Sequence, residues 1–417
     1  MTDAEEDQGL SSPSLSSVIF PLEIWMQIIP YLDPALPECR EALVGPCLRS
    51  TPMATLCQPK LYRQLRYSTS SLHVSKLENI CDLLERRPEM RHWTKEFTPV
   101  DADTTAVNVH FIAVFKRILR LMLGIQKLVI LKMITTLSMY EEIGRMSGLE
   151  ELQWIDRHQG DEAWTTTRIP LRPSHLRLPS HLRLKKLEIR HTGQIKMAET
   201  EFASLIEFMI PSREHLQSLV LSNEAFANWA YDYLDTSIEL FQNLLHLTLP
   251  EPANREEMFF LILLEACPNL RTLEFSQREA PGGEVTTDAF DLTTVPLLQE
   301  FRGPLWLAVL FVWDRPIETL EVSCGHDVIQ PFGLGRSLLR RLMGSARPVL
   351  NLKLSGVSWS DNGRWTEDWL QAVWACFPHL RNLEVHFDER SFITLVSLCF
   401  GLQYSQHVDP RIFRIGS

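Results

Sequence analysis

Apolar residues recur along most of this chain in the order Leu-x-x-Leu-x-apolar, where x is usually polar. Two clear copies are Pro268-Asn-Leu-Arg-Thr-Leu-Glu-Phe275 and Pro378-His-Leu-Arg-Asn-Leu-Glu-Val385. The last two apolar positions alternate with polar ones, which predicts a short strand with one buried face. Helix-like apolar segments precede both copies, at 258–267 and 365–377, and the following proline predicts where each helix ends.

The same spacing occurs ten times between residues 125 and 385, and the middle apolar residues are 19 to 35 positions apart. In chain order the three apolar positions are Ile125/Leu128/Ile130, Leu149/Leu152/Trp154, Leu184/Leu187/Ile189, Leu216/Leu219/Leu221, Leu244/Leu247/Leu249, Leu270/Leu273/Phe275, Leu298/Phe301/Gly303, Ile317/Leu320/Val322, Val349/Leu352/Leu354 and Leu380/Leu383/Val385. The seventh copy is degenerate because glycine stands third. Units of this length hold a strand and a helix, and each buries its apolar face against its neighbours. The pattern therefore predicts the α/β class, with a solenoid of irregular strand-helix repeats over residues 125–400.

The segments that flank these repeats have other patterns. Residues 1–17 are acidic and rich in serine, with few large apolar residues, so we expect a disordered tail. Residues 77–84 and 107–123 have apolar residues at three- and four-residue spacing, which predicts helices. We expect residues 68–124 to form the N-terminal cap of the repeat domain, and residues 401–417 to be a C-terminal cap or tail.

A short amphipathic helix is predicted after the acidic tail, with Pro21 at its first position. Its apolar residues at helical spacing are Leu22, Trp25, Ile28, Ile29 and Leu32. Further along, Gly45-Pro46 predicts an interruption of a second helical region, because proline cannot donate to the preceding turn. The paired acids Glu141-Glu142 are expected early in a later helix, where negative charge is favourable.

Composition narrows the classes of partner and compartment. The formal net charge of -11 and a pI near 5.7 argue against nucleic acid or an anionic membrane as a general partner. The apolar run Leu305–Trp313 is too short to span a bilayer, and the N-terminus lacks the pattern of a signal peptide. The eight cysteines show no zinc-site spacing. We therefore expect a cytoplasmic and/or nuclear protein without a metal or cofactor.

The region after the tail resembles a known family. Phe20-Pro21-Leu22-Glu23-Ile24-Trp25 through Leu32 is similar to the first helix of an F-box of the fungal type. Leu43 and Cys47-Leu48-Arg49 lie roughly where that motif has its second apolar block. The segment Gln58–Tyr67 resembles the strand start that often follows a fungal F-box, and an F-box followed by leucine-rich repeats is a known architecture. Residues 18–67 are therefore predicted to be an F-box-like helical motif with a strand start.

The resemblance implies the substrate receptor of an SCF-type ubiquitin ligase, which does no chemistry itself. In that family the F-box docks on a small helical adaptor attached to a cullin, and the leucine-rich repeats hold the target protein. The residues expected to face the adaptor are Pro21, Leu22, Ile24, Ile28, Ile29 and Leu32. The identity of the target cannot be read from the sequence.

Two other interpretations remain open. The chain could be a leucine-rich-repeat interaction scaffold without a ligase role, in which residues 18–60 are needed for folding and bind no adaptor. It could also be a hydrolase, but the sequence has no Gly-x-Ser-x-Gly, His-Glu-x-x-His or Walker-type motif. No catalytic residues are therefore predicted.

The strand residues that face away from the predicted core form a candidate surface for the target. The candidates are Lys186, Glu188, Arg190, Thr248, Glu274, Glu321, Lys353, Glu384 and His386. The four glutamates either attract a basic partner or keep the surface soluble. A basic cluster suits an acidic or phosphorylated segment, or is a solvated loop. It comprises Arg168, Arg172, Arg177, Arg183, Lys185, Lys186 and Arg190.

Overall fold

The computed structural model describes two compact units, residues 1–65 and 66–417, whereas the sequence placed the boundary at residue 67. The described residues are 22–34, 36–69, 74–101, 109–122, 124–131, 137–156, 182–191, 211–222, 241–251, 260–276, 294–323, 340, 342–357, 372–387 and 412–416. The predicted tail, 1–17, lies outside them. No helix among them is long and apolar enough to cross a membrane.

The first unit is helical. Its elements are α1 (Leu22–Ile28), the 3-10 turn η1 (Ile29–Tyr31), α2 (Pro37–Arg49) and α3 (Thr51–Leu61). The Ser50 hydroxyl accepts a hydrogen bond from the Met53 N–H at 3.3 Å, which caps the start of α3. The core consists of Ile29, Leu43 and Cys57, surrounded by partly buried Trp25, Leu32, Cys47, Met53, Leu56 and Leu61.

The expected interruption at Gly45-Pro46 is wrong, because α2 runs through both residues to Arg49. A proline removes only one backbone hydrogen bond from a helix. Here α2 packs along α3 and buries Leu43 completely, so these tertiary contacts stabilise the helix across Gly45 and Pro46. Pro30 has a larger effect, since α1 ends at Ile28 and Pro30 lies in the 3-10 turn that follows.

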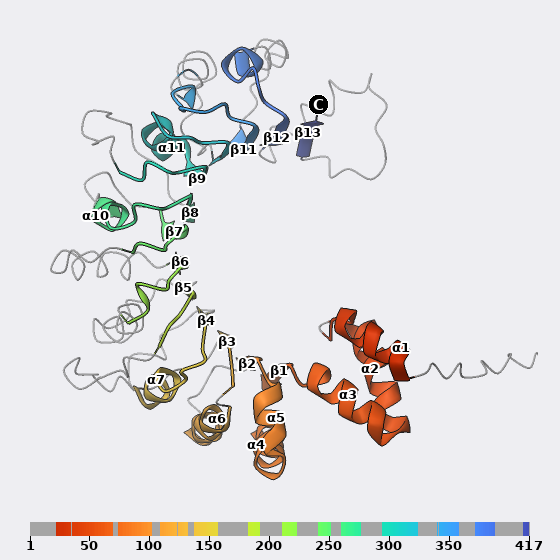
Figure 1. The fold of residues 1–417 in the computed structure, drawn as a ribbon. Helices are drawn as coiled ribbons and strands as arrows, with labels where there is room; N and C mark the ends of the chain where they lie inside the picture. Colours follow the sequence, from red (N-terminus) through yellow and green to blue (C-terminus); the bar gives the residue numbers. More distant parts are fainter. Residues whose placement is uncertain are drawn as a thin grey trace, which may run out of the picture. The chain divides into compact units, whose positions relative to one another are not determined.

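The second unit contains a sheet whose thirteen described strands are ordered as they follow in the chain, β1 to β13 (Figure 1). From β2 to β12 neighbouring strands are parallel, and β13 pairs antiparallel with β12. The strands are β1 (Gln64–Thr69), β2 (Glu96–Asp101), β3 (Lys127–Leu131), β4 (Glu151–Asp156), β5 (Lys186–His191), β6 (Ser218–Leu221), β7 (His246–Pro250), β8 (Thr272–Ser276), β9 (Glu300–Pro304), β10 (Thr319–Ser323), β11 (Asn351–Val357), β12 (Asn382–Phe387) and β13 (Ile412–Gly416). The predicted α/β class and the predicted positions of β3 to β12 are confirmed.

One backbone motif recurs where ten successive strands begin. The carbonyl oxygen of Gln126 accepts hydrogen bonds from the N–H groups of both Glu150 and Glu151, at 2.8 and 2.9 Å. The other carbonyls that accept two consecutive N–H groups belong to Lys95, Glu150, Lys185, Gln217, Leu245, Arg271, Gln299, Glu318 and Leu350. These twenty distances lie between 2.7 and 3.1 Å. The motif fixes the register of each strand on the one before it.

This register stacks the apolar positions of the repeats in rows. Leu128 pairs with Leu152, which pairs with Leu187, and the row continues in the same way to Leu383. Every member of this row is buried. Because side chains alternate between the two faces of a strand, a slip of one residue would turn the whole row to solvent.

Helices cover the apolar side of the sheet, and Figure 1 shows them on one side of the column of strands. They are α4 (Val74–Arg86), α5 (Pro88–Trp93), α6 (Val109–Leu121), α7 (Leu137–Gly144), α10 (Phe260–Glu265) and α11 (Leu305–Val312). In α4 the residues Leu77, Cys81 and Leu84 share one face and are all fully buried. Of the predicted helix at 365–377, residues 372–376 are helical and 365–371 lie outside the described residues.

The shortest repeat, between β9 and β10, is explained by α11. This helix begins at Leu305, directly after the last residue of β9, so no loop separates them. Residues 307–312 are all buried, and the longest apolar run of the sequence is therefore a core helix. Arg315 follows it, almost fully buried, and donates to the carbonyl oxygens of Thr294 at 2.8 Å and Trp313 at 3.1 Å.

Glycine at position 303 makes room for a cluster of aromatic rings. The ring centroids of Phe275 and Phe301 are 6.1 Å apart, and Phe311 of α11 lies 5.8 Å from Phe301. A Cβ atom on Gly303 would lie 3.2 Å from both Phe275 Cβ and the Phe301 ring. The degenerate seventh copy is therefore a local adaptation, in which neighbouring rings fill the space that the third apolar side chain fills in the other copies.

The expectation for Glu142 is wrong, because it lies in the last turn of α7 and is buried. Burial by itself would raise the pKa of Glu142. Arg120 of α6, at 2.5 Å, and Arg145, at 3.2 Å, outweigh burial and lower that pKa. The carboxylate thus links two neighbouring helices.

We expect Gly303→Ala to lower the free energy of unfolding by about 1–3 kcal/mol, because the new methyl group would lie 3.2 Å from both Phe275 and Phe301 in a packed core. Gly45→Ala in α2 is the matched control, since no atom lies within 4 Å of the position that a Cβ would take there. It should be neutral or stabilising by up to about 1 kcal/mol. Urea unfolding followed by circular dichroism measures both, and an unchanged Gly303→Ala midpoint would contradict the packing argument.

Glu142→Gln is expected to cost about 1–3 kcal/mol at pH 7, since it removes a charged acceptor. A lowered folded-state pKa gives stability that is present above the unfolded value of about 4.3 and is lost as pH falls further. The difference from wild type should therefore shrink progressively below about pH 4.3. Urea midpoints at pH 7 and in acid test this, and a constant difference would show that the charge is irrelevant.

Candidate interaction surfaces

The side of the sheet opposite the apolar rows carries polar side chains and is called the open face here. The register aligns its central row across the strands. From β5 to β12 that row consists of Glu188, Val220, Thr248, Glu274, Arg302, Glu321, Lys353 and Glu384. Six of the nine predicted target-binding residues therefore lie in one row, and Lys186, Arg190 and His386 lie in the rows beside it.

On β5 the three predicted residues form one ion-paired group. Glu188 is 5% exposed, and its carboxylate lies 3.2 Å from Lys186 Nζ and 2.6 Å from Arg190 Nε. Both cations are thus engaged by a buried carboxylate of their own strand. Arg168, Arg172 and Arg177 of the predicted basic cluster lie outside the described residues, so the structure does not test a site for an acidic segment there.

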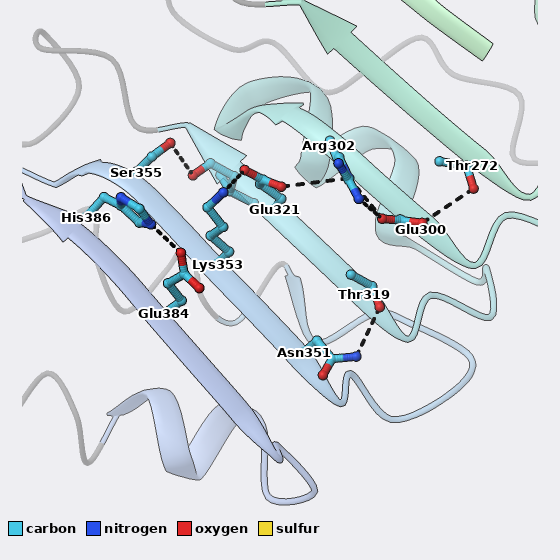
Figure 2. Close-up of polar contacts among 11 residues, drawn as sticks. Thr272, Glu300, Arg302, Thr319, Glu321, Asn351, Lys353, Ser355, Glu384 and His386 are labelled. Carbon is cyan, nitrogen blue, oxygen red and sulfur yellow. Dashed lines mark hydrogen bonds and ion pairs between the residues drawn. The ribbon is translucent and has the colours of Figure 1, made fainter. Parts of the chain in front are cut away.

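A second charged group extends over β9 to β12, and Figure 2 shows its contacts. Lys353 Nζ lies 2.5 Å from a carboxylate oxygen of Glu321. Arg302 bonds to Glu300 at 2.6 Å and approaches Glu321 at 3.7 Å. His386 Nε2 lies 2.5 Å from Glu384. Glu300 and Glu321 are therefore paired with cations on the same and neighbouring strands, and Glu384 is hydrogen-bonded to a histidine of its own strand.

The sequence analysis missed Arg302 and Glu300. They belong to the degenerate copy, where Gly303 replaces an apolar residue and the alternation of core and open-face positions is harder to recognise. The signal was present, because Arg302 occupies the same place between two core positions as Glu274 and Glu321 do in their strands. The pKa of Arg302 is raised, first by its hydrogen bond to Glu300 and also by the charges of Glu321 and Glu274.

Uncharged side chains beside the central row are also linked from strand to strand. The Asn382 side-chain amide donates to Asn351 at 2.7 Å, and the Asn351 amide donates to Thr319 at 3.1 Å. The Ser276 hydroxyl donates to the Leu249 carbonyl at 3.2 Å, and Figure 2 shows the similar bond of Ser355. These hydrogen bonds connect short polar side chains of one strand to the neighbouring strand across the open face.

The first unit has a surface of a different kind, made of exposed apolar side chains. We define the N-terminal apolar surface as Leu22, Ile24, Met26, Ile28, Tyr31, Leu36, Val44 and Leu48. Tyr31 and Leu48 are the most exposed, at 87% and 83%. Each residue of a helix is turned by about 100° from the last, so α1 carries apolar side chains around most of its circumference.

The predicted adaptor-facing residues divide between this surface and the core. Leu22, Ile24 and Ile28 are exposed, whereas Ile29 is 7% exposed and Leu32 packs on the same core. Pro21 lies outside the described residues. Sequence reasoning treated the helix as having a single apolar face and therefore missed the other exposed members. The spacing of Val44 and Leu48, one turn apart in α2, was the signal for two of them.

The described cysteines are free thiols, and Cys57 illustrates their role. Burial, assisted by neighbouring Cys47, raises its pKa to about 12. Such a thiol is protonated at neutral pH and acts as a small apolar side chain. Within the described part of the chain, no group of three or more His, Cys, Asp or Glu side chains could hold a metal ion.

Comparison of the chain with known protein-family models and with curated proteins found no match. The functional argument therefore depends on the two surfaces, which differ in chemistry. The open face is polar and internally ion-paired, and the N-terminal apolar surface consists of exposed apolar side chains. A polar, ordered face suits selective contacts, and an exposed apolar one suits a partner that covers it.

We expect Lys353→Met to change the free energy of unfolding by less than about 1 kcal/mol, because exposed ion pairs contribute little. Leu352→Ala, one residue away on the buried side, should cost about 2–5 kcal/mol. Urea unfolding of the two variants provides the comparison. Equal losses would mean that an ion pair of the open face contributes as much to stability as a member of the apolar row.

Proposed function

We propose that this protein is the substrate-recognition subunit of an SCF-type ubiquitin ligase. Its first unit is an F-box that docks on the cullin adaptor, and its second unit is a leucine-rich-repeat domain that binds a target protein. The protein positions the target and carries out no catalysis, and it works in the cytoplasm or nucleus. The observation that carries the proposal is the N-terminal apolar surface.

The concentration of exposed apolar side chains supports a docking role. Of the twelve large apolar residues that are exposed in the described part of the chain, eight lie between residues 22 and 48. Scattered exposed apolar residues need no explanation, but a group of them on a small unit indicates a protein partner. Helical units dock such residues in the apolar groove of another protein.

The small core of the first unit supports the same conclusion. Only Ile29, Leu43 and Cys57 of its described apolar residues form the fully buried cluster. A short chain buries a smaller fraction of its surface than a long one, so small units commonly depend on further contacts. Covering exposed residues such as Met26 and Leu48 with an adaptor would add about 25 cal/mol for each Å² of apolar surface removed from water.

The sequence resemblance and the apolar surface coincide. The segment similar to the first helix of an F-box contains Ile24 and Ile28, one turn apart and equally exposed at 37%. The segment similar to the second block contains Leu48, which is exposed, beside Leu43 and Cys47, which pack in the core. The motif therefore supplies both a core and an outward surface.

A second candidate is a leucine-rich-repeat scaffold without a ligase role. The observation in its favour is that Trp25, Ile29 and Leu32 pack on the core of the first unit, as they would in a simple folding cap. In that case the exposed residues would have no adaptor to bind, and the chain would act only through the open face. A binding measurement separates the two functions.

Leu22→Asp combined with Ile28→Asp should leave the fold intact and weaken adaptor binding at least about 100-fold, because two charges would enter an apolar contact. Co-expression with the SCF adaptor, followed by pull-down and a titration, measures this. The matched control is Leu297→Asp with Met343→Asp, which changes two similarly exposed apolar residues of the second unit. Unchanged adaptor binding by the folded N-terminal variant would contradict the proposal. An equal loss of adaptor binding in the control variant would also contradict it.

A further inference from the structure

The strands β2 to β12 run parallel, so they begin along one edge of the sheet. We call the ten residues before each strand its entry segment. In the entry segments of β3 to β8, the exposed residues that the structure describes are polar, apart from Gly148. In those of β9 to β12 they include all four large apolar residues that are exposed in the described part of the second unit, namely Leu297, Trp313, Met343 and Trp374. The edge therefore changes from polar to apolar at β9.

Contacts with the next repeat hold Trp313 in place. A Cβ atom on Gly344 would overlap the Trp313 indole ring, so the ring lies directly against the glycine. The Asp314 N–H donates to the Gly344 carbonyl oxygen at 2.8 Å and anchors the backbone beside the ring. Trp313 is nevertheless 49% exposed. A tryptophan that is positioned in advance and half open to solvent loses little conformational entropy when a partner covers it.

Backbone strain occurs in the same part of the edge. In the described part of the chain, the residues other than glycine with a positive φ are Val295, at 52°, and Asp314, at 58°. They lie in the entry segments of β9 and β10, close in sequence to Leu297 and Trp313. Strained residues persist only where surrounding contacts impose their conformation, and they cluster at functional sites. Strain and exposed apolar side chains thus coincide here.

A groove with a volume of about 290 Å³ lies between the entry segments of β11 and β12. Its apolar lining includes Met343, Pro348 and Phe377. Met343 is 47% exposed and directly precedes Gly344, against which the Trp313 ring lies. The groove and the ring therefore form one continuous apolar surface. The volume is at the lower limit of the range of about 300–1,000 Å³ typical of small-molecule sites, so the groove suits a single anchoring side chain.

The charges at the groove are mainly positive. Its ionisable lining residues are Arg347, Cys376 and His379, and no carboxylate of the described residues lines it. Arg347 donates to Glu318 at 2.8 Å, but the two side chains are 57% and 39% exposed, so this pair is weak. A guanidinium has five N–H donors, which leaves donors of Arg347 for a second carboxylate.

A second arginine adds to this charge. Burial raises the pKa of the Cys376 thiol, and the charge of Arg340 opposes the rise, so Arg340 lies near the groove. Two arginines and the carboxylate of Glu318 give a local formal charge of +1, opposite in sign to the -11 of the whole chain. The groove therefore favours an acidic residue beside the apolar side chain that fills it.

We infer that Trp313, Met343 and the groove between β11 and β12 form a docking surface for a protein segment that carries a large apolar residue next to Asp or Glu. The apolar side chain fills the groove and covers Met343, and the carboxylate pairs with Arg347. Tryptophan and methionine are enriched at the centre of protein interfaces. This surface belongs to the second unit, and the argument for it does not depend on a ligase role.

The test begins by selecting binders of the full-length protein from random peptides displayed on phage. We expect the enriched peptides to share a large apolar residue next to Asp or Glu. A fluorescein-labelled synthetic copy of the most frequent peptide then serves as the probe in fluorescence anisotropy titrations. Failure to enrich any peptide would overturn the inference, as would enrichment of peptides with Lys or Arg beside the apolar residue.

Met343→Asp should weaken binding of the probe at least about tenfold, because a charge enters the apolar contact and repels the acidic residue. The matched control is Gln242→Asp, which adds the same charge to the entry segment of β7. Its distance is four strand intervals, roughly 19 Å at about 4.8 Å each. This exceeds the screening length of about 8 Å at physiological salt, so the control should change the affinity less than about threefold. Equal affinities of the two variants for the probe would contradict the inference.

A charge exchange tests the pairing with Arg347. Arg347→Glu should weaken binding of the probe about tenfold, and a probe with Lys in place of its acidic residue should bind this variant better than it binds wild type. Arg347 is 57% exposed, so its replacement leaves the core intact, and circular dichroism checks the fold of every variant. If the two charge changes act independently of each other, the carboxylate does not pair with Arg347 and the inference is overturned.

Two controls identify the occupant and separate this inference from the proposed function. Light scattering should show a monomer, and a dimer that Met343→Asp dissociates would identify a second copy as the occupant and overturn the inference. In adaptor pull-down, Met343→Asp should retain the adaptor. If wild type binds the probe as expected but not the adaptor, the ligase proposal falls and the docking surface stands. If the adaptor binds and no selected peptide depends on Met343, the inference falls and the ligase proposal stands.

Discussion

The register between successive strands is the constraint on which the rest of the second unit depends. At ten strand starts a single carbonyl oxygen accepts the N–H groups of two consecutive residues in the next repeat, as Gln126 does for Glu150 and Glu151. This pair of hydrogen bonds prevents a strand from shifting by one residue relative to the strand before it. Because side chains alternate between faces, the same bonds decide which residues enter the core and which form the open face.

The helical connections are free to vary because the register is set by the backbone. Between β9 and β10 the connection shrinks to α11, which follows its strand without a loop. The cost of that arrangement is a crowded core, and Gly303 relieves it by leaving space for Phe275 and Phe301. Elsewhere the connections are longer, and Glu142 ties α7 to α6 through Arg120.

The two surfaces of the protein are arranged by different physical effects. On the open face, charged side chains meet within and between strands, so Glu188 contacts Lys186 and Arg190 of its own strand, and Glu321 contacts Arg302 and Lys353 of the neighbouring strands. On the first unit, a core of three buried residues cannot cover all the apolar side chains of its helices. The open face is therefore polar and internally ion-paired, whereas the first unit leaves apolar side chains exposed.

The sequence by itself determined the strands and their buried faces, since the spacing of Leu273 and Phe275 is local and repeated. The sequence also determined the central row of the open face, because side chains alternate along a strand and Glu274 and Glu384 therefore lie on the side opposite the core. Only the tertiary structure decided which cations meet those carboxylates, because Arg302 becomes their neighbour through strand pairing. The tertiary structure also keeps α2 continuous through Pro46, and it buries Ile29 while leaving Ile28 exposed. Both outcomes depend on packing between segments, which the local sequence pattern does not contain.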